Sequence, residues 1–350
     1  MKLSVVVPTY NRSGLLRDAV ASLLRAPVPD GLEVTILIID NNSKDDTAEV
    51  VAQLQEKAPL PVRYFRETKQ GLSHSRNRGI SEADGDLVGF IDDDEQIEEN
   101  WYRIIAREFS DPDTKFIGGP YLGNWVSPQP DWLPPGYPAV IGVVPPKPRG
   151  LFGKELGANL MGGNAVIRRS IFEQVGGYST RLGRSGKGLL SEEDAEFYSR
   201  LEDNRVRGVY VPDLVIFHYI APERLTRRYH RRWAFWRTVS QGLLNRDRPE
   251  PFVHLFGIPR HRIGRALRCL VRLPTDRLSK GGKCKAFADE LAVWDLAGFI
   301  YGKYFFRPDS YYKDASENAG SDRAGTDGGK AGQRYVNSSD GTPRKERASN

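Results

Sequence analysis

The chain has 350 residues, a formal net charge of +6 and 27% charged residues. This length is sufficient for one large or two ordinary domains around a substantial hydrophobic core. Two cysteines, Cys269 and Cys284, are too few for a disulfide framework and lack the spacing of a zinc site. The apolar N-terminus is short and ends at Pro8, which is typical of a strand and not of a signal peptide. We therefore expect a cytoplasmic protein.

Positive charge is concentrated in one part of the chain. Residues 224–285 hold 17 Lys/Arg and 3 Asp/Glu, a local charge of +14. Such a segment suits phosphate-bearing ligands, an anionic membrane surface or nucleic acid. We expect no nucleic-acid partner, because the sequence lacks zinc-finger spacing and an aromatic-rich strand of the RNA-binding kind. Two interpretations remain: peripheral contact with the inner face of the cell membrane, and a solvated helical surface.

The first hundred residues alternate between strand-like and helix-like segments. Apolar and β-branched runs predict strands over 4–7, 34–39, 62–65 and 87–91. The segments between them predict helices over 13–24, 46–57 and 73–82. This alternation predicts an α/β fold with a mainly parallel sheet and helices on its faces.

Residues 120–157 break the alternation. This segment contains nine prolines, interleaved with Trp125, Trp132 and Tyr137. It predicts neither a helix nor an ordinary strand, and a loop of this length in a compact domain is often functional. An irregular surface insertion packed by its own aromatic residues is the open alternative.

Regular structure resumes near residue 164. Residues 164–168 are followed by predicted helices at 169–175 and 192–201, and by short strands at 209–211 and 215–217. Residues 225–244 predict a basic, aromatic helix. Charged residues interrupt the apolar run 289–306, which therefore predicts an amphipathic helix on the domain or on a membrane surface, and not a membrane-spanning one. We expect residues 308–350, which contain almost no large aliphatic residues, to be disordered.

The sequence contains two acidic groups, one directly after a predicted strand and one at the start of a predicted helix. Asp92-Asp93-Asp94-Glu95 comes directly after the predicted strand 87–91, at the strand end where open α/β sheets bind ligands. Adjacent carboxylates repel one another, and a hard divalent ion relieves this repulsion and can bridge to phosphate. A solvated acidic turn is the alternative. The second group, Glu192-Glu193-Asp194, opens a predicted helix, whose dipole alone would account for it.

Polar residues also follow the other predicted strands. Tyr10 offers a ring on which a base can stack, and Asp40 offers an acceptor for a nucleobase or a ribose hydroxyl. A helix-capping role for Asp40 is the alternative. Arg76 and Asn77 lie on a predicted helix after Gly71, where they can meet a base or a diphosphate; an exposed polar helix face is the alternative.

The order of these motifs resembles that of family 2 glycosyltransferases of the GT-A fold. The resemblance covers residues 1 to about 240 and rests on Pro8-Thr9-Tyr10-Asn11-Arg12, Ile39-Asp40-Asn41-Asn42-Ser43, Gly71 to Gly79, Asp92–Asp94, Glu193-Asp194 and His218. It implies a Rossmann-like GT-A catalytic domain over 1–223, with a nucleotide-binding half over 1–118 and an acceptor half over 119–223. A basic helical extension over 224–307 and the disordered tail would follow.

The resemblance also implies roles for single residues. The nucleotide would be bound by Pro8, Tyr10, Arg12, Asp40, Asn41, Gly71, Arg76, Asn77, Asp92 and Asp93. Asp94 would coordinate Mn²⁺ or Mg²⁺ held by the donor diphosphate, with His218 as a further ligand or, alternatively, as a structural residue. The metal would neutralise charge on the departing nucleoside diphosphate. Asp194, with Glu193 as the second candidate, would be the catalytic base of an inverting transfer.

We therefore expect an inverting, metal-dependent glycosyltransferase with a nucleoside diphosphate sugar donor, UDP-linked, and a glycan, polysaccharide or lipid-linked acceptor. Because the transmembrane helices of processive synthases are absent from the sequence, we do not expect processive polymerisation. One alternative is a sugar nucleotidyltransferase, which typically carries a glycine-rich, lysine-bearing signature where this chain has Pro8-Thr9-Tyr10. The other is a non-catalytic nucleotide-binding scaffold at a membrane surface.

Overall fold

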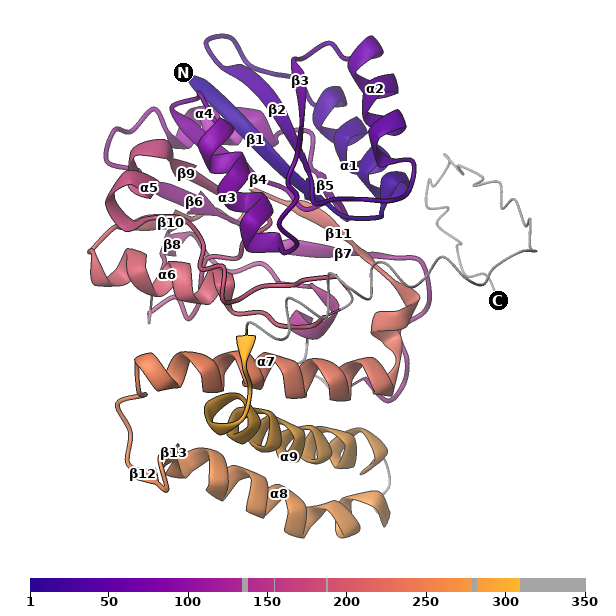
Figure 1. The fold of residues 1–350 in the computed structure, drawn as a ribbon, viewed down its shortest axis with the longest axis vertical. Helices are drawn as coiled ribbons and strands as arrows, with labels where there is room; N and C mark the ends of the chain where they lie inside the picture. The colour runs from indigo at the N-terminus through magenta and orange to yellow at the C-terminus, as the bar shows by residue number, and fades with distance from the viewer. Residues whose placement is uncertain (134–137, 154, 187, 279–281, 309–350) are drawn as a thin grey trace, which may run out of the picture.

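The computed structural model describes residues 1–133, 138–153, 155–186, 188–278 and 282–308 (Figure 1). An α/β domain built around one large sheet lies above a stack of helices from the C-terminal part of the chain. The expected disorder of residues 309–350 falls outside the described residues.

The large sheet confirms the predicted α/β class. Within the described residues its strand order is β3-β2-β1-β4-β9-β6-β10-β8. The strands are β1 (Lys2–Thr9), β2 (Glu33–Asp40), β3 (Val62–Arg66), β4 (Leu87–Phe90), β6 (Phe116–Gly118), β8 (Gly150–Leu151), β9 (Ala165–Arg168) and β10 (Gly208–Tyr210). Strands β3, β2, β1 and β4 pair in parallel, and β10 is parallel to β6. Strand β9 is antiparallel to both its neighbours, and β8 is antiparallel to β10.

Both faces of this sheet are buried, which explains the continuous apolar runs. Val5 and Val7 of β1 belong to one hydrophobic cluster, whereas Val6 belongs to the cluster on the opposite face. Helices α1 (Ser13–Arg25), α2 (Thr47–Lys57) and α4 (Trp101–Glu108) contribute to the first cluster. Helices α5 (Arg169–Val175) and α6 (Glu193–Asp203) contribute to the second, and α3 (Leu72–Glu82) lies against β1 on that face. Alternate side chains of one strand thus hold helices on opposite faces.

A second, smaller sheet stands beside the first. Its order is β5-β11-β7, with β5 (Glu95–Ile97), β11 (Ile216–Ile220) and β7 (Tyr121–Trp125). The proline-rich segment 120–157 was expected to contain no ordinary strand, and β7 and β8 show that this prediction is wrong for those residues. The reason is positional, since the prolines lie outside the stretch of β7 that pairs with β11.

The C-terminal part of the chain forms a stack of helices below the domain (Figure 1). After a short 3-10 helix (Pro222–Leu225) come α7 (Arg227–Asp247), the β12–β13 hairpin (His254–Leu255 and Ile258–Pro259), α8 (Arg260–Leu278) and α9 (Gly282–Tyr304). Helix α9 packs against both α7 and α8. Close approach to α7 requires glycine in α9, because a Cβ on Gly298 or Gly302 would overlap the α7 backbone. Within the described ranges, no helix combines the length and apolarity needed to cross a bilayer.

Candidate functional site

A cavity of about 430 Å³ opens beside the carboxyl ends of β1 and β4, and its wall reaches α6 and α7. This is the edge at which open α/β sheets bind ligands. Of the residues predicted from the sequence, the wall includes Pro8, Tyr10, Arg12, Asn41, Arg76, Asp92, Asp93, Asp94, Glu193, Asp194 and His218. The structure therefore brings both acidic motifs to one cavity.

Arginines bind two of the aspartates that follow β4. Arg12 Nη1 donates to Asp93 Oδ1 at 3.0 Å and to Asp94 Oδ2 at 3.1 Å. Arg224 Nη2 donates to the same Asp94 oxygen at 3.0 Å. The hydroxyl of Thr9 donates to Asp93 Oδ2 at 2.9 Å. These charge-assisted bonds compensate the charge of the buried carboxylates.

The neighbours push the pKa values of these two aspartates apart. Burial raises the pKa of Asp93 to about 6, although Arg12 opposes the shift. Burial acts in the same direction on Asp94, but His218, Arg224 and Arg12 outweigh it and hold the pKa of Asp94 well below its ordinary value. Asp94 is therefore ionised at neutral pH.

Asp92, Asp94 and Glu95 form a group that can hold a metal ion. Each offers a carboxylate oxygen, and these oxygens lie within 4.8 Å of one another. Burial, together with Asp92 and Asp94, raises the pKa of Glu95 well above its ordinary value. Oxygen donors with surplus negative charge fit a hard divalent cation such as Mn²⁺ or Mg²⁺. The resemblance implies this role for Asp94 and His218, whereas Glu95 was predicted only as part of the acidic run that would attract a divalent ion.

His218 lies beside this group as a neutral side chain. Its Nε2 is 3.6 Å from Asp94 Oδ1 and 2.9 Å from Arg224 Nη1. Burial lowers the pKa of His218 to about 4, and Asp94 opposes the shift. Because a guanidinium can only donate, Nε2 accepts and the imidazole proton sits on Nδ1. His218 could bind a metal through Nε2 only after Arg224 had moved away.

The backbones of two glycines lie directly against the side chains of Glu95 and His218. A Cβ on Gly163 would overlap the carboxylate of Glu95, and one on Gly142 would overlap the His218 ring. Gly142 also has a left-handed φ of 76°. These two positions require glycine both for space and, at Gly142, for backbone conformation.

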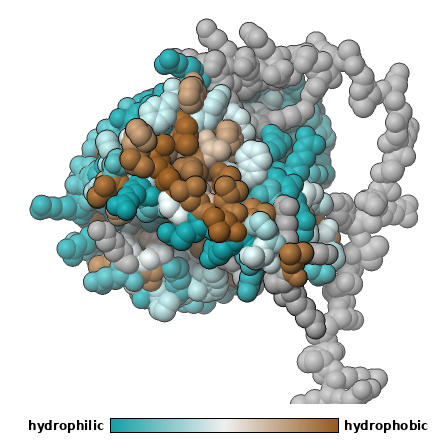
Figure 2. All heavy atoms as spheres, turned by 90° about the horizontal axis from the view of Figure 1, so that it is seen from below, coloured by the Kyte–Doolittle hydropathy of each residue, from teal (hydrophilic) through white to brown (hydrophobic). Residues whose placement is uncertain are grey.

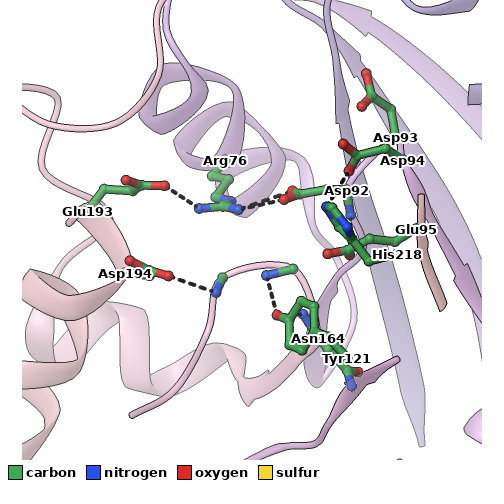
Figure 3. Close-up of polar contacts among 12 residues, drawn as sticks. Arg76, Asp92, Asp93, Asp94, Glu95, Tyr121, Asn164, Glu193, Asp194 and His218 are labelled. Carbon is green, nitrogen blue, oxygen red and sulfur yellow. Dashed lines mark hydrogen bonds and ion pairs between the residues drawn. The ribbon is translucent and has the colours of Figure 1, made fainter. Parts of the chain in front are cut away.

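Arg76 of α3 connects the two acidic groups (Figure 3). Its Nη1 donates to Glu193 Oε1 at 3.1 Å, and its Nη2 donates to Asp92 Oδ1 at 3.1 Å. Burial raises the pKa of Glu193 to about 7, Asp194 adds to the shift, and Arg76 opposes it. Arg76 thereby ties the start of α6 to the end of β4.

Asp194 differs from Glu193 in its surroundings. Its Oδ2 accepts a bond from the backbone N–H of Gly162 at 3.3 Å, and its Oδ1 accepts one from Ala195 at 2.9 Å. Within the described residues it forms no ion pair, and its side chain lines the cavity only half-buried. The Gly162 loop thus holds one oxygen of Asp194 while the side chain stays in contact with the cavity.

Two further side chains fix the loop that carries Gly162 and Gly163. The Tyr121 hydroxyl accepts bonds from the backbone N–H groups of Gly163 at 3.0 Å and Asn164 at 2.6 Å (Figure 3). The Asn164 side chain donates to the Leu214 carbonyl at 2.6 Å. This loop crosses the cavity between the two acidic groups.

Three predicted residues do not belong to the cavity wall: Asp40, Gly71 and Asn77. Asp40 accepts from the Tyr64 hydroxyl at 2.6 Å and from the Ser43 N–H at 2.8 Å. Asn77 donates to the Tyr178 carbonyl at 2.8 Å and accepts from its N–H at 2.7 Å. The nucleotide-binding roles assigned to these three residues stay predictions.

Sequence reasoning missed two arginines of the wall, the buried Arg224 and the half-buried Arg184. Arg224 comes from the 3-10 helix after β11, and Arg184 comes from the segment before α6. The only bond found for Arg184 Nη2 in the described part of the chain is to the Tyr229 hydroxyl, at 3.4 Å. Burial raises the pKa of Tyr229, but Arg184 and Arg224 outweigh it and lower that pKa. Arg184 had no local sequence signal, and Arg224 was hidden among many basic residues.

Comparisons with known proteins agree with this arrangement. The model of the family "Glycosyl transferase family 2" matches residues 4–176. A glucosyl-dolichyl phosphate glucuronosyltransferase of Haloferax volcanii is 27% identical over 252 residues, covering 70% of this chain and 78% of that protein. A GalNAc(5)-diNAcBac-PP-undecaprenol beta-1,3-glucosyltransferase of Campylobacter jejuni is 41% identical over 98 residues, covering 27% of this chain and only 30% of that protein.

A solved structure has the same fold. The mannosyltransferase of Pyrobaculum calidifontis, determined in complex with GDP-Man and Mn²⁺, matches with a TM-score of 0.50 at 16% identity. The match covers 91% of this chain and 79% of that chain. At this identity the likeness shows the fold alone, and it confirms the expected GT-A architecture.

Proposed function

Because residues 4–176 place this chain in glycosyltransferase family 2, we propose that it transfers a sugar from a nucleoside diphosphate sugar to a lipid-linked or polymeric glycan acceptor, with inversion at the anomeric carbon. One observation carries the proposal. The carboxylates of Asp92, Asp94 and Glu95 and the carboxylate of Asp194 line the same cavity from different elements. The two relatives named above carry lipid-linked saccharides in their names, which supports a lipid-linked acceptor.

Asp194 is the proposed catalytic base. In an inverting transfer one carboxylate takes the proton of the acceptor hydroxyl as that oxygen attacks the anomeric carbon. Asp194 lines the cavity with one oxygen held by the Gly162 N–H, whereas Glu193 is buried and paired with Arg76. We therefore assign Glu193 to positioning Arg76, and proton removal to Asp194.

The acidic group after β4 is the proposed metal site. Asp92, Asp94 and Glu95 would hold Mn²⁺ or Mg²⁺, which would supply neutralising charge to the departing nucleoside diphosphate. Arg12 and Arg224, which both donate to Asp94, would bind the phosphates of the donor. Tyr10 and Pro8, at the end of β1, form the wall that we assign to the nucleotide base.

The test compares the chain with its Asp194→Asn variant. We expect transfer from the accepted donor to fall by about 10²–10⁴-fold, because a general base contributes that much, while donor binding measured by thermal shift is retained. Asp203→Asn, at the far end of the same helix and paired with Arg248 on the surface, is the matched control and should keep full activity.

Donor identity is tested by a panel of nucleotide sugars with and without Mn²⁺, in which we expect a UDP-linked sugar to be consumed. Full activity of the Asp194→Asn variant would show that Asp194 is not the catalytic base. Release of pyrophosphate instead of a nucleoside diphosphate would identify the nucleotidyltransferase alternative. Donor binding without any turnover by the unaltered chain would favour the scaffold.

A further inference from the structure

Apolar side chains gather on the face of the molecule farthest from the large sheet. Figure 2 views this face from below, where Figure 1 places α8 and the β12–β13 hairpin, and it shows a contiguous brown area with teal at its edges. We call this area the apolar patch and define it by the exposed residues Phe252, Val253, Leu255, Phe256, Leu267, Leu270 and Val271. Patches of this kind on soluble domains mark interaction sites.

Helix α8 has an outward-facing apolar stripe. Ala266 and Cys269 are buried on the side of α8 that packs against α9. Leu267, Leu270 and Val271 follow at positions i, i+3 and i+4 on another side, and Val271 is 77% exposed. A helix that needed only to cover the domain would present polar residues there. The stripe is therefore a candidate surface for an apolar partner.

The β12–β13 hairpin also has an apolar side chain, Phe256, that faces outward. Phe256 is 86% exposed although its backbone has a left-handed φ of 49°, which is uncommon for a bulky residue. Helix α9 fixes this tip, because the Tyr304 hydroxyl donates to the Phe256 carbonyl and the Lys303 ammonium donates to the Gly257 carbonyl, both at 2.6 Å. The phenyl ring is thus held out into solvent by a rigid support.

Arginines accompany the stripe along α8. The helix contains six arginines and one aspartate. Arg265 and Arg272 pair with Asp295 and Asp289 of α9. Arg260 and Arg268 are exposed and have no carboxylate within ion-pair distance in the part of the chain that the structure describes. These two guanidinium groups are available to anions beside the patch.

The combination of charge and apolar surface selects one occupant. A second copy of the chain, docked about a two-fold axis, would bring the same arginines face to face in a segment of charge +14. An anionic bilayer instead offers acyl chains to the apolar side chains and phosphates to the arginines. We propose that α8 and the hairpin dock this protein on an anionic lipid bilayer. Phe256 and Val271 enter the headgroup boundary, and Arg260 and Arg268 contact lipid phosphates.

Flotation with lipid vesicles tests the proposal on the full chain. We expect it to float with vesicles that contain about 30% phosphatidylglycerol in phosphatidylcholine and to float poorly with pure phosphatidylcholine, with binding reduced by salt. Phe256→Ser with Val271→Ser should reduce partitioning by about tenfold or more. Arg260→Glu with Arg268→Glu should abolish the preference for anionic lipid. Vesicle binding is measured without donor, so its outcome is independent of the proposed activity.

The controls are exposed residues on other parts of the molecule. Leu151→Ser and Arg103→Glu change a comparable apolar residue of β8 and a comparable cation of α4, and both should leave flotation unchanged. All substitutions are at the surface, and circular dichroism of each variant would check that it is folded. Failure of the unaltered chain to float, or equal losses in the controls, overturns the proposal. So does a dimer in sedimentation that the Phe256 and Val271 variant dissociates, because the patch is then an interface between copies.

Discussion

The guanidinium of Arg76 donates to Glu193 on one wall of the cavity and to Asp92 on the other. Both Arg76 and Glu193 are buried. Above the pKa of Glu193, which is about 7, this contact is a buried ion pair. Removing one partner under those conditions leaves the other charge without compensation, which typically costs about 3–5 kcal/mol. We expect Arg76→Met to lower the free energy of unfolding by that amount in urea denaturation. Adding Glu193→Gln should restore part of the loss, and no recovery in the double variant would contradict the pairing.

A pH dependence of stability follows from Glu193. Its pKa lies at about 7 in the folded chain, against an ordinary value of 4.5, because of burial and Asp194. The folded state therefore keeps a proton that the unfolded state releases, and the stability from this group falls as pH rises through this window. We expect Glu193→Gln, which stays neutral, to gain in melting temperature relative to the unaltered chain between about pH 4.5 and about pH 7. A constant difference would refute the assigned shift.

The loop carrying Gly162 and Gly163 can follow its path because these two glycines have no side chains. A Cβ on Gly163 would overlap the Glu95 carboxylate, which is itself fixed by a 2.8 Å bond from the Asp92 N–H. We expect Gly163→Ala to lower the free energy of unfolding by about 1–3 kcal/mol, as overpacking does, and to impair transfer. Gly14→Ala in α1, where a Cβ meets nothing within 4 Å, is the control. It should be neutral or stabilise by up to about 1 kcal/mol, and equal losses would show that packing at Glu95 is not the cause.

Elements buried on both sides were predictable from the sequence. Strands β1, β2 and β4 carry continuous apolar runs because helices cover both faces of the sheet. The second sheet was not predictable in full, since β5 begins within the acidic run and β7 lies inside the proline-rich segment. Helix α8 lies in the predicted basic helical extension 224–307, but its bounds were not predicted. Its apolar stripe faces outward and arginines interrupt it, so the usual pattern of a domain-covering helix is absent.

At the scale of the whole molecule, the helical stack packs against the α/β domain and shares a hydrophobic cluster with it. Leu182 and Leu190 are buried in one cluster with Val239 and Leu243 of α7. A chain ending at residue 223 would expose both leucines, which would lower the free energy of unfolding by about 1.5–3 kcal/mol for each. It would also lack the cavity residues of α7. We expect this truncation to give no cooperative melting transition. A chain ending at Pro308 keeps every described contact and should melt like the full chain; similar behaviour of the two truncations would disprove this dependence.

The same scale explains which site residues the sequence could indicate. Asp92, Asp93, Asp94, Glu193 and Asp194 stand in local motifs, and the sheet topology brings them to one cavity. Arg184 and Arg224 reach that cavity from segments with no motif, through contacts distant in sequence. Such contacts depend on the final packing of α7 against the domain, which no local pattern encodes.

The bonds from Arg12 and Arg224 to Asp94 mean that the protein supplies its own counter-ions to this carboxylate. If the proposed function holds, a divalent ion bound by Asp94 would replace these guanidinium groups, and the freed arginines would then need anions. A nucleoside diphosphate that arrives together with the ion would meet both needs in one exchange of partners. We therefore expect the ion and the nucleotide each to bind more tightly in the presence of the other.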